Sequence, residues 1–125
     1  MVFLDTNIIL EITLKDRAKF QQVKSFLEKV DDTTAISMLS VHLIMHFGRK
    51  EKADDTYLEG IIDQNVLLAL TPDDYQWAKS NEHRKDFENA LQLAVAIRTG
   101  CETFVTLDQE LAKAYAELPI NIQTI

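Results

Sequence analysis

The chain has 125 residues, a length that suits one domain built around one hydrophobic core. Its 46% hydrophobic and 26% charged residues are the proportions of an ordinary globular protein, which excludes a disordered or fibrous chain. The formal net charge of −7 argues against a protein that grips nucleic acid through a broad basic surface, but it is compatible with an acidic site that binds a divalent cation.

The cysteine content and the N-terminal residues indicate the cellular compartment in which the protein is expected. The single cysteine, Cys101, cannot form an intramolecular disulfide, so we expect a reducing compartment, the cytoplasm. Asp5 interrupts the first apolar run and no basic region precedes it, which is not the pattern of a signal peptide. No apolar run approaches the length that crosses a bilayer, so we expect no membrane contact. Without linkers or repeats, residues 1–125 are predicted to be one domain.

In the first half of the chain, two strands and three helices are predicted. Residues 2–5 form an apolar run that ends in an aspartate, and apolar residues recur at helical spacing over 16–30. The segment 33–37 predicts a second strand. It leads into 38–50, a helical pattern with a wide apolar face and two basic residues at its C-terminal end. Residues 53–64 predict a further helix.

The second half of the chain repeats this alternation. The apolar run 66–70 is typical of a buried strand. Thr71 then predicts a helix N-cap, with Pro72 at the first helical position. Residues 86–98 form the clearest helical pattern, and Gly100 follows it where a left-handed cap would lie. The remaining predicted elements are a strand over 103–106, a helix over 109–117 and a strand over 120–124.

Alternating strands and helices predict a parallel sheet of four to five strands, covered on both faces by helices. In such sheets, binding sites form at the carboxyl ends of the strands. Asp5 and Asp108 both stand at predicted strand ends. We therefore expect the two carboxylates to lie close together and to share a site.

Three segments carry more specific motifs: "FLDTNIIL" (3–10), "DFENALQLAVA" (86–96) and "TFVTLDQEL" (103–111). Together they resemble the PIN-domain family, and within it the small VapC-like ribonucleases of bacterial and archaeal toxin–antitoxin systems. The resemblance implies a three-layer α/β/α sandwich and an acidic cleft that binds Mg²⁺ or Mn²⁺ and hydrolyses RNA phosphodiesters. It also implies a small antitoxin protein as partner and a homodimer.

The resemblance assigns catalytic and metal-binding roles to particular residues. Asp5 matches the family's first acid, and Asp108 matches its last acid, in a Thr-x-Asp motif. Asn89 stands where the family usually has aspartate, and Leu43 stands where it usually has a glutamate. Small PIN proteins with an Asp-Phe-Glu-Asp-Ala-Leu segment also lack that glutamate, and in them Asp86 has a counterpart. The predicted supporting residues are Thr6, Asn7, Ser37 and Thr106.

Metal chemistry explains why these departures matter. Mg²⁺ prefers hard oxygen ligands, and the bound metal lowers the pKa of a water molecule. An asparagine keeps an oxygen ligand but loses a charge, so metal affinity is expected to fall. Asp86 shares a helix face with Asn89 and is expected to supply the missing charge. Glu88 points about 100° away from Asn89 and is less suited. The predicted metal ligands are Asp5, Asp86, Asn89 and Asp108.

Each acid also has a simpler structural interpretation. Asp5 would be a strand-end residue that bonds its own backbone, Asp86 a helix-start acid and Asp108 a helix N-cap. His42 and His46 have a spacing that suits a transition metal, but core or interface residues are the simpler interpretation.

Two other functions remain open beside the metal-dependent ribonuclease. The first is a catalytically degenerate PIN domain that binds RNA or protein, because two of the family's four acids are absent. The second is a small-molecule or nucleotide-binding α/β domain, although no Gly-rich phosphate loop supports it. Under the ribonuclease hypothesis, Arg84 and Lys85 are expected to contact RNA phosphate.

Overall fold

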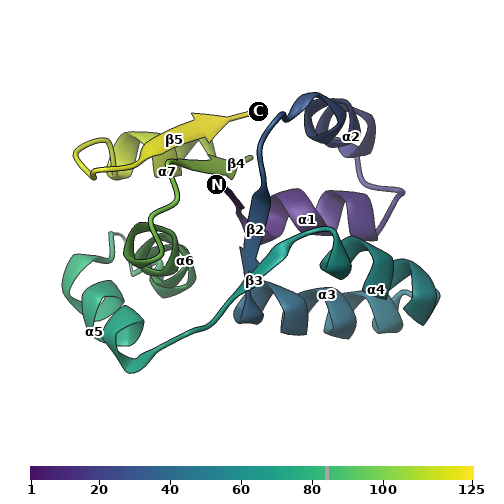
Figure 1. Ribbon diagram of the computed structural model, residues 1–125, viewed down its shortest axis with the longest axis horizontal. Coiled ribbons are helices and arrows are strands. Elements are labelled where there is room, and N and C mark those ends of the chain that lie inside the picture. Colours follow the sequence, from purple (N-terminus) through teal and green to yellow (C-terminus); the bar gives the residue numbers. More distant parts are fainter. Residues whose placement is uncertain (84) are drawn as a thin grey trace.

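The computed structural model describes residues 1–83 and 85–125, and its centre is a five-stranded, wholly parallel sheet (Figure 1). The strand order is β3-β2-β1-β4-β5, so the first strand lies in the middle. The strands are β1 (Val2–Leu4), β2 (Thr34–Ser37), β3 (Val66–Leu68), β4 (Thr103–Thr106) and β5 (Asn121–Thr124). The helices are α1 (Thr6–Thr13), α2 (Phe20–Lys29), α3 (Met38–Lys50), α4 (Asp55–Asp63), α5 (Pro72–Asn81), α6 (Phe87–Arg98) and α7 (Gln109–Ala114).

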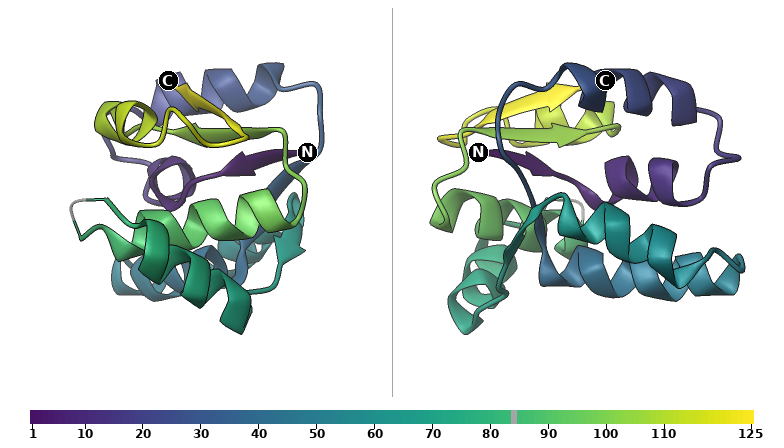
Figure 2. Two further views of the ribbon diagram at one scale, coloured as in Figure 1. Left: turned by 90° about the vertical axis from the view of Figure 1, so that its left-hand side faces the viewer. Right: turned by 45° about the vertical axis from the view of Figure 1, so that its right-hand side comes forward.

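Helices cover both faces of the sheet because alternate strand residues point to opposite sides. Leu4 and Val105 belong to a core shared with α1, α2, α3 and α4. Phe3 and Phe104 belong to the opposite core, with residues of α6 and α7, and their rings stack 5.2 Å apart across the β1–β4 pair. Figures 1 and 2 show the two groups of helices on either side of the strands. The predicted three-layer α/β/α sandwich is confirmed.

Helix α1 was not predicted, and it begins directly after the first strand. Its sequence is rich in β-branched residues, which disfavour a helix in isolation. The Asp5 side chain caps the helix by accepting a hydrogen bond from the Thr6 N–H. Ile8 and Ile9 are fully buried in the core, and this burial outweighs the weak helix propensity.

The strand β3 differs from its predicted character. The apolar run 66–70 predicts a buried strand, but β3 lies at the edge of the sheet, where Val66 and Leu67 are 41% and 44% exposed. This prediction was wrong because the sequence of one strand does not reveal its position in the strand order. Two predicted helices are also shorter than expected, with α2 beginning at Phe20 and α7 ending at Ala114.

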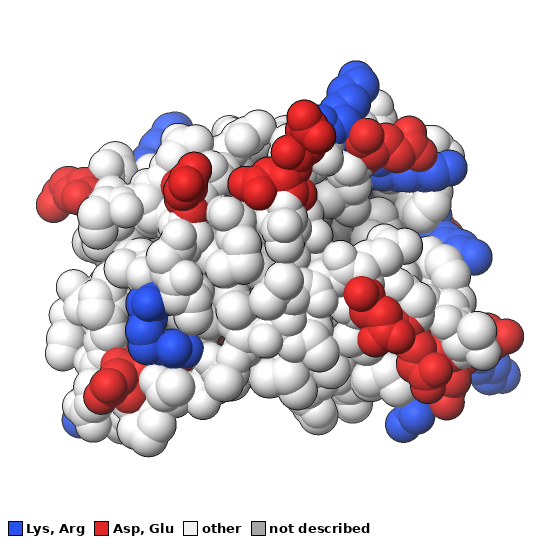
Figure 3. Space-filling model, in the orientation of Figure 1, with Lys and Arg blue, Asp and Glu red and all other residues white. Residues whose placement is uncertain are grey.

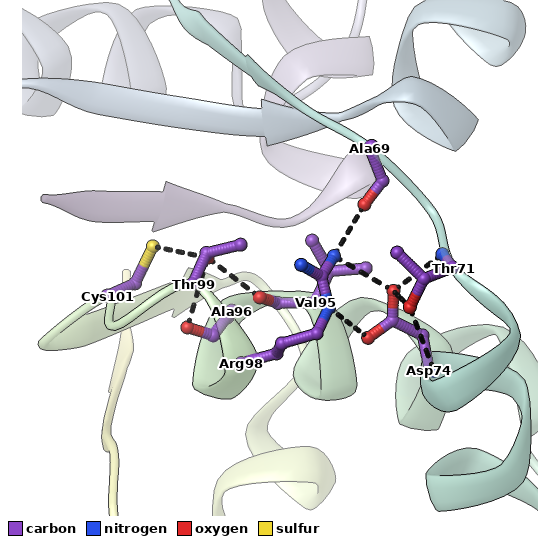
Figure 4. A network of polar contacts seen from close by, with 8 residues as sticks. All are labelled: Ala69, Thr71, Asp74, Val95, Ala96, Arg98, Thr99 and Cys101. Atoms are coloured by element: carbon purple, nitrogen blue, oxygen red, sulfur yellow. Dashed lines mark hydrogen bonds and ion pairs between the residues drawn. The ribbon is translucent and has the colours of Figure 1, made fainter.

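An ion pair between the exposed Arg98 and the buried Asp74 joins helices α5 and α6 (Figure 4). The Arg98 guanidinium donates to both carboxylate oxygens of Asp74, at 2.8 and 3.0 Å, and to the Ala69 carbonyl at 2.7 Å. Asp74 also completes a capping box with Thr71, the predicted N-cap of α5. Gly100 follows α6 with a left-handed φ of 77°. These contacts fix the C-terminal half of α6, whose other end faces the candidate site.

Within the described residues, none of the helices combines the length and the apolar character needed to cross a bilayer.

Candidate functional site

Polar side chains gather at the carboxyl ends of three neighbouring strands, β2, β1 and β4. Asp5 follows β1, Asp108 follows β4 by two residues, and Ser37 ends β2. The Asp5 backbone N–H donates to the Val105 carbonyl, so the ends of β1 and β4 remain paired up to the site. Parallel pairing thus brings the two ends of the sequence together, as predicted.

Asp5 is a buried carboxylic acid, with only 2% of its surface exposed. Its Oδ1 accepts from the Thr6 N–H at 2.8 Å, and its Oδ2 accepts from the Thr106 hydroxyl at 2.8 Å. Burial raises the pKa of Asp5 from its ordinary 3.8 to about 6, against the opposing effect of the two hydrogen bonds. The negative charges of Glu88 and Asp108 raise this pKa further. The site therefore concentrates negative charge around a buried carboxyl group.

The Thr106 hydroxyl connects the two strand-end acids. It donates to Asp5, and it accepts from the Asn7 side-chain amide and from the Asp108 backbone N–H, both at 3.1 Å. The Asn7 side-chain oxygen in turn accepts from the Leu107 N–H at 3.1 Å. Asn7 and Thr106, both predicted as supporting residues, thus hold the Thr-x-Asp segment against the start of α1.

Asp108 is a helix N-cap, which was its simpler structural interpretation, and it also lies at the candidate site. Its Oδ1 caps α7 by accepting from the backbone N–H groups of Glu110 and Leu111, at 3.0 and 3.2 Å. The same carboxylate raises the pKa of Asp5. A helix N-cap is therefore compatible with a position in the acidic group.

Asp86 and Asn89 form a pair at the start of α6. Asp86 is the N-cap, and its Oδ1 accepts from the Asn89 backbone N–H at 3.4 Å. The Asn89 side-chain amide donates to the other carboxylate oxygen of Asp86. Both residues line a pocket of about 60 Å³ together with Asp108. The pair therefore lies beside the last acid, and the amide of Asn89 offsets part of the negative charge of Asp86.

Glu88 adds a further carboxylate near Asp5. Its charge raises the pKa of Asp5, and its own pKa is raised by burial and by the charge of Asp86. Glu88 stands in the first turn of α6, between Asp86 and Asn89 in the sequence. The residue as a whole is exposed.

Sequence reasoning missed Gln92, a fully buried residue of α6. Its side chain contacts the predicted supporting residues Thr6 and Ser37. The available signal was a single amide within the apolar pattern "ALQLAVAI".

The remaining sequence candidates that the structure describes lie outside the acidic group. His42 and His46 stack on α3 with ring centroids 6.0 Å apart. Lys85 is exposed and has a left-handed φ of 57°, and Arg84 lies outside the described residues. Leu43 is half-buried on α3, one turn beyond Ser40.

The donors around Asp5 match a hard divalent cation in kind, because they are carboxylate, amide and hydroxyl oxygens. In number they are sparse: over 1–83 and 85–125, no three His, Cys, Asp or Glu side chains gather closely enough to enclose a metal ion. Mg²⁺ tolerates such a site, because it commonly takes one or two carboxylates and fills its other positions with water and substrate phosphate.

Comparisons with known proteins bear on the family and the fold. A family model described as PIN domain matches residues 1–110. No curated protein matches the chain. Among solved structures, the chain is similar to a toxin–antitoxin complex from Klebsiella pneumoniae, with a TM-score of 0.77 at 20% identity, over 99% of this chain and 97% of that chain.

Two further solved structures share the fold. VapC20 from Mycobacterium tuberculosis, a sarcin–ricin loop cleaving toxin, gives a TM-score of 0.76 at 14% identity, over 97% of this chain and 99% of that one. VapBC2 from Rickettsia felis, bound to a DNA fragment from its promoter, gives 0.64 at 16% identity, over 100% and 99% of the two chains. With the family model matching residues 1–110, this chain belongs to the PIN-domain family.

Proposed function

We propose that this protein is a metal-dependent endoribonuclease of the VapC type with an altered acidic cluster. One observation carries the proposal: Asp5 is buried at a strand end, and the charges of Glu88 and Asp108 raise its pKa. Two carboxylates about 5 Å apart repel each other by roughly 3 kcal/mol at an effective dielectric constant near 20. Such an arrangement is costly to the fold unless a cation neutralises it.

In this proposal, Asp5 and Asp108 bind Mg²⁺ or Mn²⁺ directly, while Asp86 and Asn89 assist from the start of α6. When bound, the cation lowers the pKa of a water molecule and neutralises charge on the phosphate. The chain's own residues position the ligands. Thr106 holds the Asp5 carboxylate by a 2.8 Å hydrogen bond, and its contact with the Asp108 N–H holds the second acid beside the first.

The surface charge agrees with a local mode of RNA binding. On the face drawn in Figure 3, Lys and Arg side chains stand apart from one another, and most lie near Asp or Glu. Such a face gives an RNA backbone no continuous basic track. We place the RNA contacts near the site, where Lys85 precedes the α6 N-cap.

An antitoxin is the partner that the relatives support. The Klebsiella pneumoniae structure is a toxin–antitoxin complex, and VapBC2 from Rickettsia felis is a complex bound to promoter DNA. By analogy, a small antitoxin binds this chain and blocks the acidic site, and the chain forms a homodimer. Co-expression of the chain with the protein encoded beside it, followed by co-purification, tests the partner.

Cleavage of a labelled single-stranded RNA tests the proposed activity. We expect weak cleavage by the wild type that requires Mn²⁺ or Mg²⁺ and stops in EDTA. Asp5→Asn removes a direct ligand charge while keeping the side-chain shape. It should lower the rate at least about 100-fold, since changes outside the ligand shell already cost about 10–100-fold. Equal cleavage by both proteins would indicate a contaminant or another site.

Asn89→Asp tests the altered cluster. It replaces the amide that donates to Asp86 with a second carboxylate, so the two residues repel each other unless a cation lies between them. We expect a lower melting temperature in EDTA and faster cleavage in Mn²⁺. Asn81→Asp makes the same charge change at the exposed C-terminal end of α5, where it also loses the hydrogen bond from Asn81 to the Trp77 carbonyl. It should therefore lower the melting temperature equally with and without Mn²⁺ and leave cleavage unchanged.

A degenerate binding module is the second candidate. The Asp86–Asn89 contact favours it, because both side chains already satisfy each other without a metal. Cleavage by Asn89→Asp but not by the wild type would favour this candidate. If neither folded protein cleaves RNA in Mn²⁺, the nuclease proposal is contradicted.

A further inference from the structure

A buried polar cluster lies behind Asp5, and we call it the Gln92 cluster. It consists of Thr6, Ser37, Ser40 and Gln92, each between 0% and 4% exposed. The Gln92 Nε2 donates to Thr6 Oγ1 at 2.6 Å and to Ser40 Oγ at 3.0 Å. Its Oε1 accepts from the Ser37 hydroxyl at 2.6 Å. One side chain of α6 therefore binds the starts of both α1 and α3.

Hydrogen counting fixes the orientation of the amide. With the Gln92 Nε2 facing Thr6 and Ser40, both Nε2 hydrogens have hydroxyl acceptors, and Oε1 has a hydroxyl donor. The reversed amide would present two hydrogens to Ser37 alone, and a buried N–H without an acceptor costs about 1–3 kcal/mol. Thr6 Oγ1 and Ser40 Oγ lie 2.9 Å apart and share a further hydrogen. Thr6 is thus held in one rotamer by two independent contacts.

The cluster connects the two halves of the acidic site. Gln92 lies three and four residues after Asn89 and Glu88, on the same side of α6. Thr6 lies next to Asp5, and its backbone N–H donates to Asp5 Oδ1 at 2.8 Å. A path of two hydrogen bonds therefore runs from α6, which carries Glu88 and Asn89, to the Asp5 carboxylate. A displacement of α6 relative to α1 would break the first of these bonds.

We propose that Gln92 is a positioning residue of the acidic site: it acts through Thr6 to hold Asp5 in register with Glu88 and Asn89. The proposal rests on the proposed ribonuclease function. It assigns no contact between Gln92 and RNA or metal, because the residue is fully buried.

A purely structural role makes a different prediction, and matched variants separate the two. Gln92→Met keeps an unbranched chain of similar length but removes all three hydrogen bonds. Leu93→Ala removes buried volume from the next residue of α6, which belongs to the core around Phe3 and Phe104 and has no polar side-chain atom to donate or accept in the Gln92 cluster. If Gln92 only stabilises the fold, each variant should lose activity in proportion to the decrease in its melting temperature.

The positioning role predicts a specific kinetic pattern in RNA cleavage. Gln92→Met should lower kcat about 10–100-fold with KM changed by less than about twofold, the range of residues that orient metal ligands. Leu93→Ala, assayed well below its melting temperature, should keep kcat within about twofold of the wild type. Equal losses in the two variants would overturn the proposal.

A double-mutant cycle then tests whether Gln92 acts through Thr6. Thr6→Val removes the hydroxyl but keeps the backbone N–H that bonds Asp5. If Gln92 acts through this hydroxyl, the double variant should be no slower than the slower single variant. Losses that multiply would show independent roles and overturn the proposed path.

Hydrogen–deuterium exchange separates failure of this inference from failure of the ribonuclease proposal, because it needs neither RNA nor metal. Gln92→Met should speed exchange of the Thr6 amide by at least about tenfold, more than Leu93→Ala does. If the wild type cleaves no RNA but this exchange changes, the positioning of Asp5 stands and the nuclease assignment falls. If the wild type cleaves RNA and neither exchange nor kcat changes in Gln92→Met, only the positioning role falls.

Discussion

Replacing Asp5 with asparagine should stabilise the metal-free protein, although it removes the central acid of the site. The folded-state pKa of Asp5 is about 6, against an ordinary value of 3.8. The folded protein therefore holds this proton more tightly than the unfolded chain does. The resulting stability is fully present below about pH 4 and is lost as the pH rises through about 6. At higher pH, ionised Asp5 lowers the free energy of unfolding by about 3 kcal/mol.

The hydrogen bonds of Asp5 reduce the expected gain. Thr106 donates to Asp5 Oδ2 and already accepts from Asn7 and Asp108, so an amide NH₂ in that place finds no acceptor there. This mismatch costs about 1 kcal/mol. Asp5→Asn should thus gain about 2 kcal/mol at about pH 8 and lose about 1 kcal/mol at about pH 4. For a chain of this length, the gain corresponds to a rise of about 6–10 °C in melting temperature.

Thermal unfolding followed by circular dichroism measures this crossover. Both proteins are heated in EDTA over a series of pH values, and again in millimolar Mn²⁺. Metal should raise the melting temperature of the wild type and leave that of Asp5→Asn unchanged, because a ligand stabilises only the state that binds it. A difference between the two proteins that stays constant with pH would refute the reasoning about the buried charge.

Two further predictions concern packing and the ion pair of Figure 4. In urea unfolding, Gly48→Ala should lower the free energy of unfolding by about 1–3 kcal/mol, because its Cβ would lie 2.5 Å from Leu58 Cδ2. The matched control is Gly60→Ala in the neighbouring helix α4, where the added Cβ meets nothing within 4 Å; it should raise the free energy of unfolding by about 0.5–1 kcal/mol. A Gly48→Ala variant as stable as the wild type would contradict the α3–α4 packing. Arg98→Met should cost about 1–3 kcal/mol, because it strips the nearly buried Asp74 carboxylate of its guanidinium partner. Asp74→Asn in the Arg98→Met background should reduce that loss, and additive losses would show that the pair is not coupled.

The sequence predicts the sheet better than it predicts the position of each strand within it. Strand and helix periodicities locate most elements, and helix 38–50 has its predicted bounds. The segment 66–70 has the apolar residues of a buried strand, yet β3 is an edge strand. Residues 6–13 have poor helix propensity, yet they form α1 because Ile8 and Ile9 reach the core. Both errors arise where tertiary context decides what local preference cannot.

Some residues of the candidate site can likewise be predicted from the sequence, and others cannot. Asp5 and Asp108 follow from the rule that parallel strands end at one edge, which needs no knowledge of side-chain contacts. The contact between Asp86 and Asn89 and the position of Glu88 depend on how α6 begins, which is set by the Asp86 cap. Gln92 was missed because a single amide in an apolar helix gains its meaning only from the hydroxyls that surround it.

The pairing of the first strand with the fourth also sets the moment in biosynthesis at which the site forms. Asp5 leaves the ribosome early, but its partner Thr106 is 101 residues further along the chain. Until that segment emerges, β1 has no neighbour on its β4 side, and Asp5 remains hydrated with the acidity of an ordinary aspartate. Contacts this distant in sequence form late, after the intervening helices are available. The acids of the candidate site can therefore come together only after the chain has been made as far as β4.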